Sequence, residues 1–198
     1  MIGNKLEQSI IAVFQNNLSN TYSINEISRI LKKSYPNINK KSNYFLKEGI
    51  LKKINIGKSY QCFLNLDSEK TKIFMAVNEL NIKEEFLKDN KEFGKVFDEL
   101  SQIYKRFSVD TIIYFKKNLI FILKDLSDKV SISELTVMSR AYNHQFMTVQ
   151  EFQALFLNDM ELQKNHVVLF SVENYLQMLS EINDKLFMKG FIKNIKND

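Results

Sequence analysis

The side chains best suited to contact an anion are concentrated near the N-terminus of the chain. Lysine, asparagine, serine and tyrosine recur between residues 33 and 60, and these residue types donate hydrogen bonds to phosphate oxygens and to base edges. The candidates are Lys33, Ser34, Tyr35, Asn37, Asn39, Lys40, Lys41, Asn43, Tyr44, Lys52, Lys53, Lys58 and Tyr60. A solvated surface explains any one of these lysines as well as a contact does, and only their clustering indicates a binding surface.

The net charge is concentrated in the same stretch. Residues 1–66 contain ten Lys/Arg and three Asp/Glu, a net charge of +7, although the whole chain of 198 residues carries only +5. Residues 67–106 and residues 107–198 each sum to −1. A localised basic block indicates an anionic partner, and we expect nucleic acid before a membrane surface.

Side chains that could act as catalysts or metal ligands are few and dispersed. Asp125 and Asp128 lie close together, but aspartates in this setting are typical of turns and helix caps. His144 and His166 have no local cysteine or carboxylate at ligand spacing, which favours two ordinary histidines over a metal site. Cys62 is the only cysteine; it excludes an internal disulfide, fits a reducing compartment and predicts a small buried side chain. We expect no metal, no cofactor and no catalytic residue.

Composition narrows the class of protein. A hydrophobic content of 44% is enough for a buried core, whereas only five glycines and one proline disfavour turn-dense all-β folds and glycine-rich phosphate loops. No apolar run approaches the roughly 20 residues that span a bilayer, and no charged-then-apolar signal opens the sequence. We therefore expect a cytoplasmic protein with no membrane partner.

Three helices are predicted to position the basic residues. Apolar residues at helical spacing predict a first helix over residues 3–18, and Ser23 with Glu26 forms a capping box before a second helix over 24–33. Pro36 suits the first turn of a third helix that ends at Gly49. The inward face of the third helix is predicted to consist of Ile38, Ser42, Phe45 and Leu46. Residues 50–56 and 59–66 predict two strands joined at Gly57 and Lys58.

The rest of the chain predicts further helices and a small sheet. Helices are expected over 68–78 and 82–107, and the second carries an aromatic stripe that is too wide for a two-stranded coiled coil. β-Branched and aromatic runs predict strands at 109–115, 119–123, 144–149 and 167–170. Shorter helical segments are expected at 131–141, 150–157 and 160–164, with a last helix over 172–186.

Three helices followed by a basic hairpin is the order of a winged helix. The segment SINEISRILKKSYPNINKKSNYFLKEGILKKINIGKSYQCFLNL resembles the winged helix-turn-helix domains of archaeal DNA-binding proteins, including the closing LKEGIL and the hairpin. The resemblance covers about residues 3–66. It implies that the third helix enters the major groove and that the turn and the hairpin, or wing, contact phosphates on either side.

The second half resembles the minimal nucleotidyltransferase-like domain that is sometimes fused to such a winged helix. The resemblance covers about residues 100–182 and is carried by VDTIIYF, LIFILKD, HQFMTVQEFQALF and LQKNHVVLFSVENYLQML. That family uses a Gly-Ser turn and a D-x-D pair, which admit the phosphates and hold magnesium. Here the turn is Phe115, Lys116, Lys117 and Asn118, and the chain contains no D-x-D. Lys116 and Asn118 stand where the metal-binding aspartates would be, so the resemblance implies a domain without transferase activity.

Together these patterns predict an α+β protein in three segments: a winged helix-turn-helix domain (1–66), linking helices (67–107) and a degenerate nucleotidyltransferase-like α+β domain (108–198). The expected function is binding of double-stranded DNA, as a transcriptional regulator, with the C-terminal domain used for homodimerisation or for binding a partner or a ligand. Two alternatives stay open. One is a divergent nucleotidyltransferase that uses Asp110, Asp125 or Asp128. The other is an antitoxin-like interaction module, in which the winged helix docks a protein partner that is not yet identified.

Overall fold

The computed structural model describes residues 4–57 and 59–195, with side chains assigned up to Lys189, and it contains both helices and strands. Helices contain 63% of the residues and strands contain 19%, so the expected α+β class is confirmed. The chain separates into two compact units. The first contains the chain up to Asn78 and again from Leu179 onward, and the second contains Glu79–Met178. Both crossings between the units lie inside helices, namely α4 (Glu69–Asp89) and α9 (Val172–Glu181).

This division differs from the three consecutive segments expected from the sequence. Residues 67–78 belong to the first unit because they pack against it: the Thr71 hydroxyl donates to the carbonyl of Ile50 at 3.0 Å, and Met75 is fully buried. The chain after α9 also returns to the first unit. A boundary inside a helix leaves no change of composition, and the return of a distant helix is a tertiary contact, so neither is visible in the apolar spacing.

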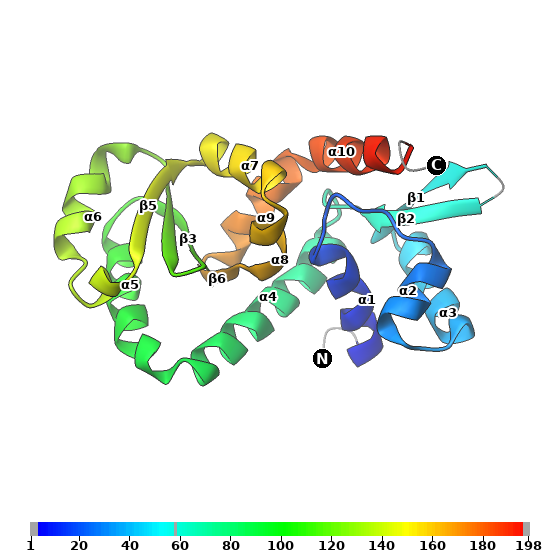
Figure 1. Cartoon of the computed structure of the whole chain (residues 1–198), viewed down its shortest axis with the longest axis horizontal. Coiled ribbons are helices and arrows are strands. Elements are labelled where there is room, and N and C mark those ends of the chain that lie inside the picture. Colours follow the sequence, from blue (N-terminus) through cyan, green and yellow to red (C-terminus); the bar gives the residue numbers. More distant parts are fainter. Residues whose placement is uncertain (1–3, 58, 196–198) are drawn as a thin grey trace. The chain divides into compact units, whose positions relative to one another are not determined.

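The first unit begins with three helices and a hairpin (Figure 1). The helices are α1 (Lys5–Gln15), α2 (Ile24–Leu31) and α3 (Tyr35–Lys47), and the strands are β1 (Leu51–Ile56) and β2 (Ser59–Leu64). Each predicted element is confirmed, with ends shifted by up to three residues. The capping box at α2 is present, since the Ser23 hydroxyl accepts from the Glu26 amide and the Glu26 carboxylate accepts from the Ser23 amide. Gly49 follows α3 with φ 71°, a conformation that costs glycine little.

The core of the first unit joins these helices to the hairpin. Ile10, Phe14, Ile27 and Phe45 are each at most 1% exposed. The backbone of Tyr22 exchanges two hydrogen bonds with that of Cys62, at 2.9 and 2.8 Å, and so extends the hairpin by one bridge. Cys62 is fully buried, as predicted, and burial raises the pKa of its thiol to about 11. The hairpin is therefore fixed to the helices along its inner face.

The second unit is built on a four-stranded sheet with the order β5-β4-β3-β6. β3 (Val109–Phe115) pairs antiparallel with β4 (Asn118–Leu123) and with β6 (Val167–Phe170), whereas β4 pairs parallel with β5 (Asn143–Thr148). One face packs on α5 (Gly94–Arg106) and α6 (Lys129–Leu135) in a core that includes Leu100, Phe121 and Leu169. The other face carries α7 (Val149–Asn158), α8 (Met160–Asn165) and α9 (Figure 1). The four predicted strands are confirmed.

Three helix boundaries were predicted wrongly. A break was expected between residues 78 and 82, but α4 runs through this stretch and ends at Asp89. The polar residues Asn78 and Glu79 are buried in the helix rather than exposed in a loop. The helix expected over 131–141 ends at Leu135, and a 3-10 turn (Met138–Ala141) follows. The helix expected over 172–186 is interrupted at Ile182, after which α10 (Asn183–Ile195) begins. Two further 3-10 turns occupy Lys91–Phe93 and Leu126–Asp128.

Across residues 4–57 and 59–195, no helix combines the length and the apolar character needed to cross a membrane.

Candidate nucleic-acid interface

The face of α3 opposite the core forms an exposed polar stripe. Ile38, Ser42 and Phe45 are buried, which fixes the rotation of the helix about its axis. The side chains on the other side are exposed at intervals of three or four residues, so they form one line along the helix surface. These residues are Asn37, Lys40, Tyr44 and Lys47. Lys47 was not among the sequence candidates, although its spacing of three residues from Tyr44 could have identified it.

The start of α3 adds further exposed candidates. Lys33, Ser34 and Tyr35 are all exposed, and Tyr35 retains 45% of its accessible surface. Among the described residues no carboxylate forms an ion pair with Lys33 or Lys40 within 4 Å. These two ammonium groups are therefore available to an anionic ligand.

The two remaining asparagine candidates of α3 bind each other. The Asn43 amide donates to the side-chain oxygen of Asn39 at 3.1 Å, one helical turn away. Asn43 is exposed, whereas Asn39 is half-buried. Asn43 thus extends the exposed stripe, and Asn39 supports it.

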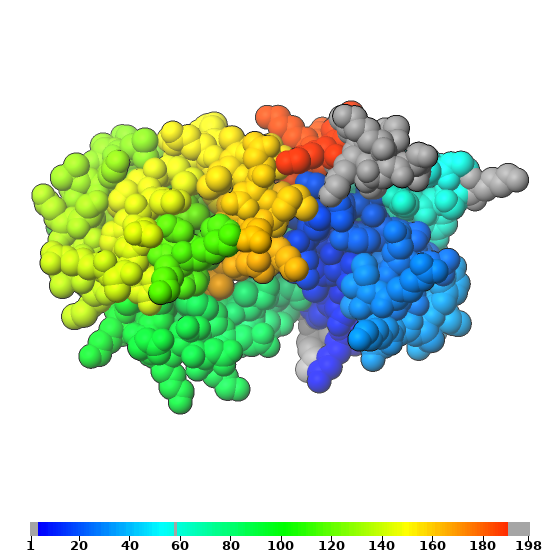
Figure 2. All heavy atoms as spheres, in the orientation of Figure 1, coloured from blue at the N-terminus to red at the C-terminus, as the bar shows by residue number. Residues whose placement is uncertain are grey.

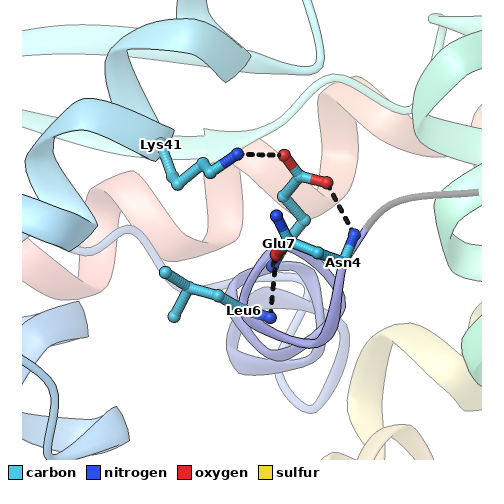
Figure 3. A network of polar contacts seen from close by, with 4 residues as sticks. All are labelled: Asn4, Leu6, Glu7 and Lys41. Carbon is cyan, nitrogen blue, oxygen red and sulfur yellow. Dashed lines mark hydrogen bonds and ion pairs between the residues drawn. The ribbon is translucent and has the colours of Figure 1, made fainter.

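Lys41 has a different environment from Lys40. Its ammonium group lies 2.6 Å from one carboxylate oxygen of Glu7. The other oxygen accepts from the backbone N–H of Asn4 at 2.8 Å (Figure 3). Burial alone would raise the pKa of the Glu7 carboxyl, but the hydrogen bonds from Lys41 and Asn4 outweigh burial, and the pKa lies below its usual value. Lys41 therefore joins α3 to the capping box of α1.

The hairpin presents its candidates on opposite faces. Lys53 pairs with Cys62 and Lys52 pairs with Phe63, so these two lysines point to different sides of the ribbon. The Lys53 ammonium lies 5.4 Å from the ring centroid of Tyr60, on the inner side with Cys62. The Lys52 ammonium lies 3.2 Å from a carboxylate oxygen of Asp67. Lys58 lies outside the described residues.

An open groove connects α3 with the hairpin. It has a volume of about 690 Å³ and is lined by Asn43, Leu46, Lys47, Gly49, Leu51, Lys52, Lys53, Phe63 and Asn65. In the space-filling view the surface of α2 and α3, in blue, adjoins that of the hairpin, in cyan (Figure 2). The structure therefore brings most of the candidates onto adjoining surfaces of one unit, while Lys41 and Lys52 are held by carboxylates.

The candidate catalytic aspartates are engaged locally in the second unit. Asp125 accepts from the Ser127 backbone amide at 3.0 Å and caps the following 3-10 turn, as predicted, whereas Asp128 makes no side-chain cap bond and accepts from the distant Ser108 backbone amide at 3.2 Å. The Asp110 carboxylate lies 3.9 Å from the Lys124 ammonium, and burial raises its pKa. The described part of the chain contains no group of three or more histidine, cysteine, aspartate or glutamate side chains that could hold a metal ion.

The turn between β3 and β4 is a tight hairpin, as predicted. Lys116 and Lys117 occupy it with φ values of 48° and 62°, the left-handed region that favours glycine or asparagine. Lys116 forms an ion pair with Glu161, and the Lys117 carbonyl accepts from the backbone N–H of Asn143 at 3.0 Å. Cations therefore occupy this end of the sheet.

Sequence reasoning missed a buried ion pair in the second unit. The Nε2 atom of His166 lies 3.6 Å from a carboxylate oxygen of Glu79, and the exposed fractions of the two residues are 6% and 0%. Burial lowers the pKa of the imidazole, but the Glu79 carboxylate outweighs burial and the pKa is raised. The two residues are far apart in the chain, so no spacing could have paired them.

Comparison with known proteins gives no match, whether to a family model, to a curated protein or to a solved structure.

Proposed function

We propose that the first unit is a winged helix-turn-helix domain and that the protein binds duplex DNA as a transcriptional regulator. The observation that carries this proposal is the exposed stripe Asn37, Lys40, Tyr44 and Lys47, which lies opposite the buried face of α3. A helix of this size fits the major groove, which is about 12 Å wide. Asparagine can read adenine there, and lysine can read guanine or bind phosphate.

The neighbouring residues suit contacts to the DNA backbone. Lys33 and Ser34 precede α3 and are exposed, and Lys53 with Tyr60 extends the basic surface along the hairpin. In this proposal Lys40 is the central contact of α3. Lys41 mainly supports the helix through Glu7, and Lys52 contributes only if it exchanges Asp67 for phosphate.

For the second unit we propose a nucleotidyltransferase-like domain without transferase activity, used for dimerisation or for binding a partner or a ligand. The lysines in the β3–β4 turn support the lack of transferase activity in this proposal, because cations at that position would repel magnesium. No observation favours nucleotide transfer by Asp110, Asp125 or Asp128.

The test is binding of the full chain to pools of fluorescent duplex DNA over a range of salt concentrations. Affinity should fall steeply with salt, since each neutralised phosphate adds about −0.9 to the slope of log K against log salt concentration. Lys40→Glu should abolish binding. Lys95→Glu, which makes the same charge change at an exposed site in the second unit, should leave it intact. Equal binding by both variants, or no binding by the unmodified chain, would sink the proposal and favour a protein-docking module.

A further inference from the structure

The last described helix packs against the hairpin within the first unit. The rings of Phe63 in β2 and Phe187 in α10 have centroids 4.3 Å apart with an interplanar angle of 31°. α10 thereby covers part of Phe63, a half-buried hydrophobic residue of the hairpin.

The strand pairing identifies the face of the hairpin that α10 contacts. Phe63 pairs with Lys52, and both lie on the side opposite Cys62. The Cys62 side is closed by the core at Leu51, Cys62 and Leu64, which are at most 5% exposed, whereas Lys53 on the same side is exposed. An isolated two-stranded hairpin is at best marginally stable in water and needs packing on a hydrophobic face. The hairpin thus has the N-terminal helices on its inner face and α10 on its outer face.

A polar contact fixes the beginning of α10 to the same hairpin. The side-chain amide of Asn183 donates to the Oδ2 atom of Asp67 at 3.0 Å, and the Lys52 ammonium lies 3.2 Å from the same oxygen. Asn183 is buried. One carboxylate just after β2 therefore joins the first residue of α10 to a lysine of β1.

We infer that α10 stabilises the position of the hairpin. Phe187 and Asn183 are then positioning residues for the DNA contacts of Lys53 and Tyr60. The expected effect on DNA binding rests on the proposed function, whereas the support of the hairpin by α10 does not. Without the Phe63–Phe187 contact, the outer face of the hairpin keeps only the polar contact through Asp67, and more of the hairpin must be ordered when DNA binds.

The experiment compares Phe187→Ala with Met188→Ala in the full chain. Met188 is the neighbouring residue on α10 and is 50% exposed, so it controls for truncating a large side chain of this helix. Hydrogen exchange of the amides in residues 51–64 is measured without DNA, and duplex affinity is measured separately. Phe187→Ala should increase the exchange and weaken DNA binding about fivefold, within the range that an aromatic pair contributes. Phe187→Tyr keeps the ring and should restore both.

Each result bears on one part of the inference. Unchanged exchange in Phe187→Ala would contradict the stabilisation of the hairpin by α10. Increased exchange with unchanged DNA affinity would contradict the positioning role of Phe187. If the unmodified chain binds no DNA, the proposed function fails, and exchange alone then decides whether α10 supports the hairpin. Asn183→Asp places a second carboxylate beside Asp67 and should increase exchange in the same region without truncating a hydrophobic side chain.

Discussion

In the second unit the imidazole of His166 and the carboxylate of Glu79 face each other at 3.6 Å, and both are buried. The Nδ1 atom of His166 lies 2.8 Å from the carbonyl oxygen of Leu162, so the ring is held at both nitrogens. The rings of Tyr175 and Phe156 lie against the same imidazole, with centroids 5.1 and 6.0 Å away. The pair therefore sits in a mostly apolar environment, where its charge state affects stability.

The stability of the protein should depend on pH through this pair. The pKa of folded His166 is raised above the ordinary value of 6.5, so its contribution is fully present below pH 6.5 and is lost as pH rises through the folded pKa. The free energy of unfolding in urea should decrease over that window. Glu79→Gln should flatten the dependence, whereas His144→Gln should leave it in place. An unchanged pH slope in Glu79→Gln would contradict the prediction.

Replacing Lys117 by glycine should stabilise the protein. Lys117 has a φ of 62° in the turn between β3 and β4, and a left-handed conformation costs a non-glycine residue about 1–2 kcal/mol. The added freedom of glycine in the unfolded chain offsets about 0.5–1 kcal/mol of this. Lys117→Gly should therefore raise the free energy of unfolding by up to about 1.5 kcal/mol. Gln102→Gly, inside α5 at an ordinary helical position, should lower it by about 1 kcal/mol. A loss of stability in both variants would show that the turn is not strained.

Substitutions of the adjacent residues Lys40 and Lys41 should have different effects, the first on DNA binding and the second on the stability of the fold. Lys41→Ala removes the ion pair with Glu7 and should lower the free energy of unfolding by about 1 kcal/mol. Lys40→Ala should leave unfolding unchanged, weaken DNA binding and reduce the salt slope by about 1. Chemical denaturation and fluorescence anisotropy of the same two preparations give both quantities. The reverse assignment of the two effects would argue against the proposed orientation of α3.

Glu99 should be needed for the turn that follows α6. Its carboxylate accepts from the backbone amides of Val137, Met138 and Ser139 at 2.8, 2.6 and 3.1 Å. Glu99→Ala should lower the free energy of unfolding by about 1–2 kcal/mol, as the loss of a helix cap does. Exchange of those three amides should increase in Glu99→Ala but not in Asp98→Ala, whose side chain is exposed.

The same carboxylate should contribute to acid sensitivity. Burial would raise the pKa of Glu99, but hydrogen bonds from Met138, Ser139 and Val137 outweigh it, and the pKa lies below 4.5. Its stabilisation is therefore present above pH 4.5 and is lost as pH falls through the folded value. Unfolding of Glu99→Gln should be less sensitive to acid than that of the unmodified protein. Equal sensitivity would place the acid-labile group elsewhere.

Local signals in the sequence predicted the elements near the candidate interface well. The Ser23–Glu26 capping box, Pro36 and Gly49 mark ends of α2 and α3 through backbone hydrogen bonding and φ preference, which depend on neighbouring residues only. The apolar spacing of Ile38 and Phe45 also identified the buried face of α3, and with it the exposed face of Asn37 and Lys40.

Pairings between distant residues could not be predicted in the same way. Lys41 and Lys52 have the residue type and position of DNA contacts, but Glu7 and Asp67 bind them in the folded chain. Whether a lysine is available depends on which carboxylate reaches it, and that depends on tertiary packing. The contact between Phe63 and Phe187 depends on the return of α10 to the first unit, which no local pattern reveals.

The first unit is assembled from two stretches of chain that the second unit separates. During synthesis α1, α2, α3 and the hairpin leave the ribosome long before α10 does, so the outer face of the hairpin stays uncovered until the second unit has been made. Nascent chains interrupted before residue 183 would carry the basic surface without its support. In this architecture the N-terminal unit reaches its final form only after translation of the C-terminal helix.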